Sequence, residues 1–182
     1  MEDTNGDGVS DIESTFAYGV GGLLREIINT SIAIGAVASR TLFEYDGVGR
    51  LIRRIDDFDG DGNADAIRVT GWDHLMPIFQ TYDRDGDGDV ESAQFYYYDR
   101  RYLPARVRSV HRDSSGTEIT DFEDVFEYDS DGRLTRAFTT QGGATETETH
   151  WSYDQEGRLG RVRTRTASFS ITRALIYQHC GN

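Results

Sequence analysis

Three stretches of the sequence combine acidic and glycine residues in the spacing of a calcium-binding loop. Each has Asp at position 1, Asp or Asn at 3, Asp at 5, Gly at 6 and an acidic residue at 9. Calcium takes about 6 to 8 oxygen ligands, and the glycine at position 6 permits the sharp turn that such a loop needs. With a backbone carbonyl at position 7, the predicted ligands are Asp3, Asn5, Asp7, Val9 and Asp11; Asp57, Asp59, Asp61, Asn63 and Asp65; and Asp83, Asp85, Asp87, Asp89 and Glu91.

Calcium is the expected cofactor because the ligand set suits no other common metal as well. Zinc prefers His or Cys ligands, and magnesium rarely occupies a cage made only of protein carboxylates. The alternative is an acidic turn that binds no ion. Three matches with the same glycines favour calcium over that alternative.

The residues around these loops indicate strands rather than the helices of an EF-hand. Position 12, where an EF-hand needs a bidentate Glu, holds Ser14, Arg68 and Gln94. The flanking segments 66–70 and 94–98 are rich in β-branched and aromatic residues, as strands are. These strand–loop–strand sites resemble the calcium hairpins of integrin-type propeller blades and, less closely, thrombospondin type 3 and dockerin loops.

The composition limits the classes of partner. The chain has 182 residues and a formal charge of −13, with 32 acidic residues against 19 basic ones. Nucleic acid and anionic membrane surfaces both need a basic footprint, so neither is an expected partner. Segment 16–38 comes nearest to a membrane span, but Arg25 and Glu26 interrupt it, so membrane insertion is not expected. The single cysteine, Cys180, allows no internal disulfide, and the length allows one domain with a sizeable core.

The sequence also repeats internally. A shift of 80 positions aligns the first acidic loop with the third, and a shift of 83 aligns 43–51 with 126–134. In the second alignment the loop at Asp57 falls on 140–144, which contains no carboxylate and is expected to form a plain turn without metal. We therefore predict one calcium-binding β-repeat domain over 1–182, with internal copies at about 3–79 and 83–178.

A second recurring motif, Tyr-Asp-x-x-Gly-Arg-Leu, predicts β-hairpins. It begins at Tyr45, Tyr128 and Tyr153, with degenerate forms at Tyr18 and Tyr98. The Asp at the first turn position can bind the backbone beyond it, and the Gly takes the left-handed conformation that returns the strand. Aromatic and polar residues alternate before each motif, with the period of two of a half-buried strand.

The expected fold is an all-β, antiparallel hairpin-repeat (meander) sheet, twisted or partly coiled and internally duplicated. Residues 20–38 also have helical spacing, but their alignment with 107–111 favours strand. Strands are expected near 12–19, 22–29, 32–45, 50–56, 64–72, 76–83, 90–98, 103–112, 117–128, 133–140, 145–153, 158–167 and 169–178.

Through the Tyr-Asp motifs the chain resembles the bacterial RHS, or YD-repeat, family, whose members string such hairpins into long, coiled β-sheets at bacterial surfaces and in toxin shells. The resemblance covers most of residues 40–178. Acidic loops replace several of the hairpin turns, and the Asp-Pro-x-Gly element that closes toxin-type cores is absent, since the only prolines are Pro77 and Pro104. The resemblance therefore implies an open or partly curled sheet rather than a sealed shell with a self-cleaving protease.

The sequence offers no catalytic constellation. The prominent acidic residues are already assigned as ligands, and the histidines lie without metal or catalytic spacing at His74, His111, His150 and His179. No catalytic residue is predicted, and the protein is not expected to be an enzyme. A calcium-dependent hydrolase is the less favoured alternative.

An arginine series lies on one face of a predicted strand near the end of the chain. Arg161, Arg163 and Arg165 alternate with apolar or hydroxyl residues. We expect them to pair with Glu146 and Glu148 of the preceding strand as an exposed ladder. A binding face for a partner is the alternative.

Together these features predict a calcium-stabilised structural or adhesive repeat module of a bacterial secreted or cell-surface protein. Its location is expected to be extracellular or at the bacterial cell surface, although the acidic N-terminus lacks the basic region of a signal peptide. Other repeat units, a surface glycan or a surface protein are the expected partners. The main alternative is a glycan- or protein-binding module that uses an exposed aromatic or arginine sheet face.

Overall fold

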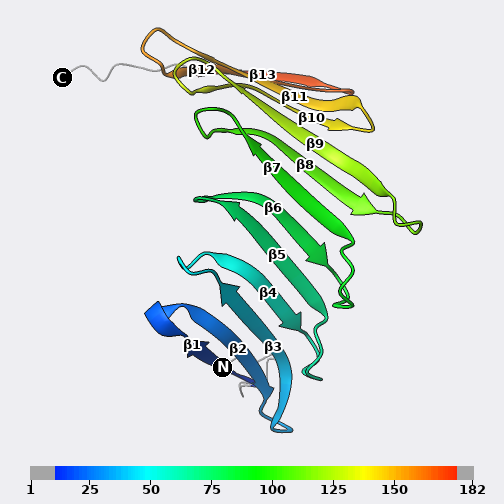
Figure 1. The fold of residues 1–182 in the computed structure, drawn as a ribbon. Coiled ribbons are helices and arrows are strands. Elements are labelled where there is room, and N and C mark those ends of the chain that lie inside the picture. The colour runs from blue at the N-terminus through cyan, green and yellow to red at the C-terminus, as the bar shows by residue number, and fades with distance from the viewer. Residues whose placement is uncertain (1–10, 176–182) are drawn as a thin grey trace, which may run out of the picture. The chain divides into compact units, whose positions relative to one another are not determined.

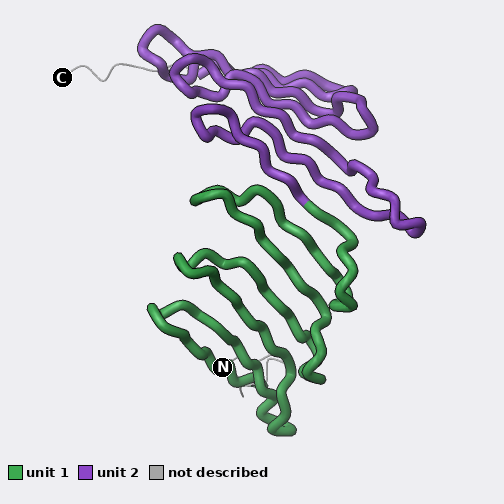
Figure 2. The backbone as a smooth tube through the Cα atoms, in the orientation of Figure 1, with its two compact units in different colours: residues 1–93 green, residues 94–182 purple. Residues whose placement is uncertain are grey.

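The computed structural model describes residues 11–175, and within them the chain is all-β, as predicted (Figure 1). The chain forms two compact units, residues 1–93 and 94–182 (Figure 2). In each unit the strands follow one another as an antiparallel meander, so that each strand pairs with the strands next to it in the sequence.

Unit 1 begins with β1 (Ile12–Tyr18), the 3-10 turn η1 (Val20–Gly22), β2 (Leu24–Ser31), β3 (Ala36–Tyr45), β4 (Leu51–Asp57), β5 (Ala66–Asp73) and β6 (Met76–Asp83). Strand β7 (Ser92–Tyr98) spans the boundary between the units. Unit 2 continues with β8 (Pro104–Arg112), β9 (Glu118–Tyr128), β10 (Leu134–Gln141), β11 (Ala144–Tyr153), β12 (Leu159–Thr166) and β13 (Ser170–Ala174).

Each observed strand lies close to one of the predicted ranges. Residues 20–38 form η1, β2 and the start of β3, so the strand interpretation of this segment is confirmed and the helical one is wrong. The predicted plain turn at 140–144 is also confirmed. Gly142 and Gly143, with φ of 57° and 83°, join β10 directly to β11 in a tight hairpin.

The expectation of a sizeable core is wrong. Among residues 11–175 only two apolar side chains are buried, Ala93 at 6% exposure and Val110 at 3%. A core forms where two layers of secondary structure face each other, and a meander supplies only one layer. Stability therefore depends on the hydrogen-bonded ladders and on side-chain contacts between neighbouring strands.

One carboxylate organises each Tyr-Asp turn. In the turn at Asp129, Oδ1 accepts the N–H groups of Asp131 at 3.0 Å and Arg133 at 2.9 Å, while Oδ2 accepts Arg133 Nε at 2.7 Å. Gly132 has a φ of 82°, and its N–H donates to the Asp129 carbonyl at 3.1 Å. The turn chemistry predicted from the motif is therefore confirmed, and the same bonds recur at Asp46 and Asp154.

The degenerate copies of the motif form the same turn with substitutions. Asp99 accepts the N–H of Arg101 and of Leu103 as the other Asp residues do, and Tyr102 takes the place of the glycine with a φ of 63°. In the turn after β1, Gly19 replaces the Asp, and the backbone bond from Gly22 N–H to the Gly19 carbonyl remains.

Along this edge, an aromatic side chain ties each of four turns to the turn before it. The Tyr153 hydroxyl donates to the Leu134 carbonyl at 2.8 Å, and Leu134 is the first residue of β10. The other bonds of this kind also end on the first residue of a strand, and they join Tyr45 to Leu24, Trp72 to Leu51 and Tyr128 to Pro104. We call this edge of each unit the tyrosine edge; its turns are 18–24, 45–51 and 72–76 in unit 1 and 98–104, 128–134 and 153–159 in unit 2.

Arginine side chains add a second tie along the tyrosine edge. The Arg133 guanidinium, held by Asp129 of its own turn, lies 5.0 Å from the ring centre of Tyr153 in the next turn. Arg50 lies 5.7 Å from the Trp72 ring in the same way. Successive aromatic residues of this edge are 25 to 30 positions apart, so the unit that the structure repeats is one hairpin, and a shift of 80 or 83 spans three of them.

Removing one aromatic hydroxyl tests this tie. Tyr153→Phe deletes the bond to the Leu134 carbonyl and should lower the free energy of unfolding by about 1 kcal/mol. Tyr97→Phe is the matched control, because the Tyr97 hydroxyl makes no hydrogen bond within residues 11–175. Chemical denaturation of both variants measures the difference. Equal effects of the two changes would show that the hydroxyl bond contributes nothing.

The turn carboxylates predict a dependence on pH. Backbone N–H groups of Arg50, Arg133 and Arg158 hold the pKa of Asp46, Asp129 and Asp154 below its ordinary value. Because the folded-state pKa is the lower one, the stabilisation is present above the unfolded-state pKa of about 3.9 and is lost as the pH falls through the folded-state value.

Replacing all three aspartates by Asn should therefore lower the melting temperature at pH 7. The difference from the unmodified protein should shrink below about pH 4, where the unfolded-state carboxylates become protonated. Thermal melts between neutral and acidic pH measure it. A difference that stays constant across this range would exclude the turn carboxylates as its cause.

Candidate metal centres

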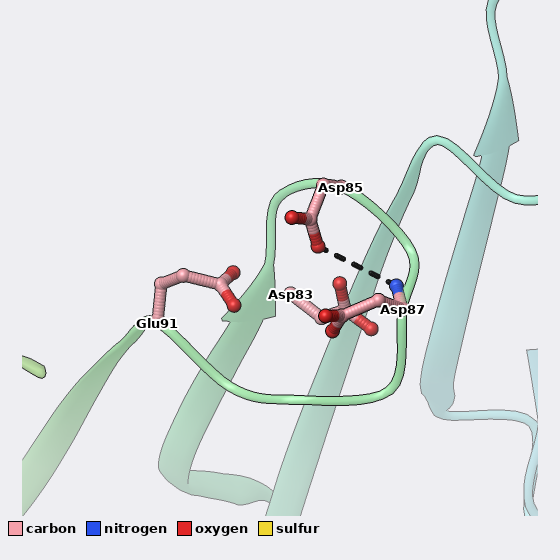
Figure 3. Close-up of side chains that lie close together, drawn as sticks. All are labelled: Asp83, Asp85, Asp87 and Glu91. Carbon is pink, nitrogen blue, oxygen red and sulfur yellow. Dashed lines mark hydrogen bonds between the residues drawn. The ribbon is translucent and has the colours of Figure 1, made fainter. Parts of the chain in front are cut away.

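Two of the three predicted calcium loops lie within the described residues, and both belong to unit 1. One joins β4 to β5 and the other joins β6 to β7, on the edge opposite the tyrosine edge. Asp57, Asp59 and Asp61 each have one carboxylate oxygen within 4.8 Å of the others, and the same holds for Asp83, Asp85, Asp87 and Glu91. Figure 3 shows the side chains of this second group.

The aspartate at position 1 anchors each loop. Asp57 ends β4 and is 6% exposed; its two oxygens accept the N–H groups of Gly60 at 2.6 Å and Gly62 at 3.0 Å. Asp83 ends β6 and is also 6% exposed, and its two oxygens accept the N–H groups of Gly86 at 2.6 Å and Gly88 at 3.0 Å. The bonds hold both carboxylates inside their loops while each oxygen keeps a lone pair for a cation.

The aspartates at positions 3 and 5 shape the middle of the loop. Asp59 Oδ1 accepts Asp61 N–H at 3.1 Å, and Asp61 Oδ1 accepts Asn63 N–H at 2.7 Å. The hydrogen bond from the Asn63 backbone, with a second from its side-chain amide, lowers the pKa of Asp61, so this carboxylate stays ionised. In the third loop, Asp87 Oδ1 at position 5 accepts the Asp89 N–H at 2.8 Å in the same way.

Position 9 differs between the two loops. Glu91 belongs to its carboxylate cluster, and its Oε2 also accepts Arg84 N–H at 2.6 Å. Asp65 makes the corresponding bond to Phe58 N–H at 2.5 Å but lies outside the cluster of its own loop. The longer Glu side chain brings its carboxylate further into the loop, so the third loop gathers one more acidic ligand than the second.

The first predicted loop lies almost wholly outside the described residues. Of its predicted ligands only Asp11 is described, and its backbone carbonyl accepts Ile32 N–H at 2.9 Å. Asp3, Asn5, Asp7 and Val9 stay predictions. The carbonyls of Asn63 and Asp89, at position 7 of the other loops, likewise stay predicted ligands.

Sequence reasoning missed the role of the glycine at position 4. Gly86 has a φ of 71°, and a Cβ added there would lie 1.8 Å from the Ala64 carbonyl oxygen in the neighbouring loop. Gly60, with a φ of 75°, would place a Cβ 2.3 Å from the Val37 carbonyl oxygen. The signal was present, because all three loops have glycine at this position. The two loops therefore pack backbone against backbone along their edge.

The three described histidines take no part in either cluster. His111 Nδ1 lies 2.5 Å from Asp121 on the neighbouring strand β9, and His74 pairs with the adjacent Asp73 at 2.8 Å. His150 lies 3.1 Å from Glu148. These three histidines therefore form pairs with neighbouring carboxylates at the surface or across strands, and His179 lies outside the described residues.

The predicted ladder between the arginine series and the glutamates is wrong. Glu148 binds Arg136 at 2.6 Å and His150 instead of an arginine of β12. Within residues 11–175, Arg161, Arg163 and Arg165 make no ion pair. Arg136 competes successfully because it lies between Glu127 and Glu148 and binds both.

A hollow of about 450 Å³ lies beside β11 and β12 in unit 2. It contains two carboxylates, Glu146 and Glu148. The hydrogen bond from Arg136 holds the pKa of Glu148 below its ordinary value. Glu148 is therefore an ionised, paired group and not a proton donor.

Scans of the sequence against protein-family models and against curated proteins find no significant match. Among residues 11–175 there is no helix long and apolar enough to cross a membrane.

Comparison with solved structures finds similarities at low sequence identity. A crystal structure of TcdB2-TccC3-Cdc42 matches over 92% of this chain with 12% identity and a TM-score of 0.44, and this chain spans 11% of that one. A porin-like protein from Bacteroides uniformis matches over 89% of this chain and 87% of its own, with 11% identity and a TM-score of 0.36. A DUF3836 family protein from Bacteroides vulgatus matches over 60% of this chain and 98% of its own, with 9% identity and a TM-score of 0.35. Scores and identities this low establish neither a shared family nor a shared function.

The packing of the loops generates a test with an internal control. Gly86→Ala combines the left-handed φ with a clash against the Ala64 carbonyl, whereas Gly88→Ala has a φ of 98° and nothing within 4 Å. Gly88→Ala should cost about 1–2 kcal/mol in stability, and Gly86→Ala should cost a further 1–3 kcal/mol, about the usual penalty of overpacking. Denaturation midpoints measure both. Equal losses would show that the loops do not pack as described.

Proposed function

We propose that this chain is a calcium-stabilised structural repeat module, in which cations hold the acidic loops of unit 1 and the hairpins form a scaffold. The observation that carries the proposal is the equivalence of the two loops. Their position-1 aspartates have the same burial, the same pair of backbone partners and the same place at the end of a strand.

The chemistry of the donors fits calcium. Each cluster offers carboxylate oxygens only, and the described residues add neither a cysteine nor a histidine to it. Hard oxygen ligands in a flexible loop suit calcium, while zinc and the softer transition metals need nitrogen or sulfur. When bound, the ion would offset the mutual repulsion of the carboxylates and close the loop between its two strands.

A structural role is supported by the way the units are built. With almost no buried apolar side chain, unit 1 has little besides ladders and edge contacts to fix its strands, so metal-closed loops would contribute a large share of its stability. The hairpins offer long, accessible faces rather than an enclosed site. An adhesive use of such faces belongs to the same proposal.

We propose no catalytic role. A hydrolase that uses two carboxylates needs one of them to act as a proton donor, with a raised pKa. In the hollow beside β11 and β12, the pKa of Glu148 is lowered instead, because Arg136 binds its charged form. The metal-cluster carboxylates would be occupied as ligands.

The proposed location is outside the cell, as part of a bacterial secreted or surface protein. Calcium sites of extracellular modules have dissociation constants of about 10⁻⁴–10⁻³ M. Such sites are filled at millimolar calcium and would be largely empty in a cytoplasm. In each loop the carboxylates at positions 3 and 5 are exposed and only the one at position 1 is buried, which fits weak binding of this kind.

Calcium should raise the melting temperature, because the ion binds only the folded loop. At 100 times the dissociation constant one site contributes about 2.7 kcal/mol, and magnesium should substitute poorly because of its short octahedral shell. Thermal melts in EDTA, in millimolar calcium and in millimolar magnesium measure the effect. Coincident melts in EDTA and calcium would exclude the proposal.

A matched pair of variants assigns the effect to the third loop. Asp87→Ala removes a carboxylate of the cluster. It should lower the calcium stoichiometry by one site and should remove part of the rise in melting temperature that calcium causes. Asp89→Ala leaves the predicted backbone ligand at position 7 in place, so this variant should keep the full calcium stoichiometry and the full rise in melting temperature. Isothermal titration with calcium measures the stoichiometry. If Asp89→Ala loses the site and Asp87→Ala keeps it, the assigned ligands are wrong.

A further inference from the structure

Three arginines on one face of β12 have no partner within residues 11–175. Arg161, Arg163 and Arg165, which we call the arginine row, are exposed and make neither an ion pair nor a hydrogen bond with the described residues. Both edges of β12 are paired, one with β11 and the other with β13 (Figure 1). The row therefore belongs to a sheet face, and its exposure does not depend on an open strand edge.

The charge around the arginine row is basic, although the whole chain is acidic. Residues 94–175 contain 13 acidic residues and 12 arginines, so the described part of unit 2 is nearly neutral. Its last segment, 157–175, contains five arginines and no acidic residue. Because salt screens exposed charges beyond about 8 Å, this local excess of arginine favours an anionic ligand on the row.

The spacing of the arginine row fits a polymer whose anionic groups are separated by neutral ones. Alternate residues of a strand lie about 6.8 Å apart, so the row offers one cation in each interval of this length. Phosphodiester groups joined by three-carbon bridges carry one charge per repeat of comparable length. Inorganic polyphosphate is charged more densely and would leave charges without a partner. The guanidinium group can bind a phosphate through two parallel hydrogen bonds.

Hydroxyl groups lie beside the arginine row on the same face. Ser170 and Thr172 of β13 are the cross-strand partners of Arg165 and Arg163. Directly opposite residues of neighbouring strands share a face, so these hydroxyls accompany the guanidinium groups as hydrogen-bond donors. Arginine together with Ser and Thr hydroxyls is a donor set that proteins use for phosphate oxygens.

The hollow beside β11 and β12 adds a hydrogen-bond acceptor at one end of the row. Arg165 and Glu146 both line this hollow. Glu146 is exposed and makes no ion pair or hydrogen bond within residues 11–175, whereas Glu148 is bound by Arg136. An ionised carboxylate accepts hydrogen bonds from alcohol groups and repels phosphate. The hollow therefore suits a ligand in which neutral, hydroxyl-bearing units alternate with anionic ones.

We propose that the arginine row and the adjoining hollow bind a linear polyol phosphate, in which glycerol units are joined by phosphodiester bonds. Successive phosphates bind Arg161, Arg163 and Arg165, and a glycerol hydroxyl donates to Glu146 in the hollow. This ligand gives a partner to the adhesive use contained in the proposed function, and the inference rests on that function for the hairpins that present the face. It needs no calcium, because every predicted metal ligand precedes residue 92.

Two arginine variants separate the row from arginine in general. Arg163→Gln removes the central cation of the row. Arg173→Gln is the matched control, because Arg173 is also exposed and without an ion pair among the described residues, but it lies opposite Val162 and so on the other face. Circular dichroism and melting temperature check that each variant folds.

Isothermal titration with synthetic linear poly(glycerol phosphate) measures the binding, in EDTA and below the melting temperature, so that calcium cannot bridge protein and phosphate. The unmodified protein and Arg173→Gln should bind equally, and Arg163→Gln should bind about tenfold more weakly or worse, because it loses a charge-assisted pair. Glu146→Ala should weaken binding of the glycerol polymer and strengthen binding of inorganic polyphosphate, which has no alcohol group. Because the calcium melts do not enter this measurement, failure of one proposal can be told from failure of the other.

Three results would overturn the proposal. The first is a folded, unmodified protein that does not bind poly(glycerol phosphate). The second is an equal loss of affinity in Arg163→Gln and Arg173→Gln, since that result would show attraction to arginine anywhere on the surface. The third is tighter binding of polyglutamate, single-stranded RNA or an acidic polysaccharide than of the glycerol polymer, which would assign the row to a different class of partner.

Discussion

Because the described strands of each unit form a single layer, the fold depends on how each hairpin is held to its neighbours. Two apolar side chains are buried among residues 11–175, so burial contributes less than in a sandwich or a barrel. The backbone ladders fix the strands in pairs, but a single sheet also needs its turns fixed relative to one another. The tyrosine hydroxyl meets this need by donating to the carbonyl of the first residue of the strand that leaves the preceding turn. This bond explains why the aromatic residue, the Asp and the Arg occur together in one motif.

The two edges of unit 1 solve this problem by different chemistry. On the tyrosine edge neutral and charged groups are satisfied within the protein, since Arg50 pairs with Asp46 and stacks over Trp72. On the opposite edge the carboxylates converge, and within residues 11–175 no arginine forms an ion pair with either cluster. The close backbone contact between Gly86 and Ala64 aligns the two loops, but it does not neutralise them. The proposed cation supplies there the positive charge that arginine supplies on the tyrosine edge.

Much of this arrangement could be predicted from the sequence because it is local. The strands follow from the period of two, and the turn at Asp129 follows from an Asp and a Gly three positions apart. The loss of metal ligands at 140–144 was visible in the same way. Features that depend on contacts between strands were not predictable. Arg136 binds Glu148, which was expected to pair with the arginine series of β12, and Asp65 lies outside its cluster whereas Glu91 belongs to its own. The small number of buried apolar side chains could not be predicted either, because apolar and polar residues alternate along a strand whether or not a second layer covers it.

The neighbour-only pairing of the strands has a consequence for how such a chain folds. In each unit every strand meets a strand adjacent to it in the sequence, so native contacts close short loops and the entropy of closure is small. Folding can then begin at any hairpin and spread to the next, as in linear repeat proteins, where stability is a sum of repeat and interface terms. Partially folded arrays become accessible states, and unfolding becomes a graded process instead of one cooperative step. Mechanical tension on such a chain would be released hairpin by hairpin.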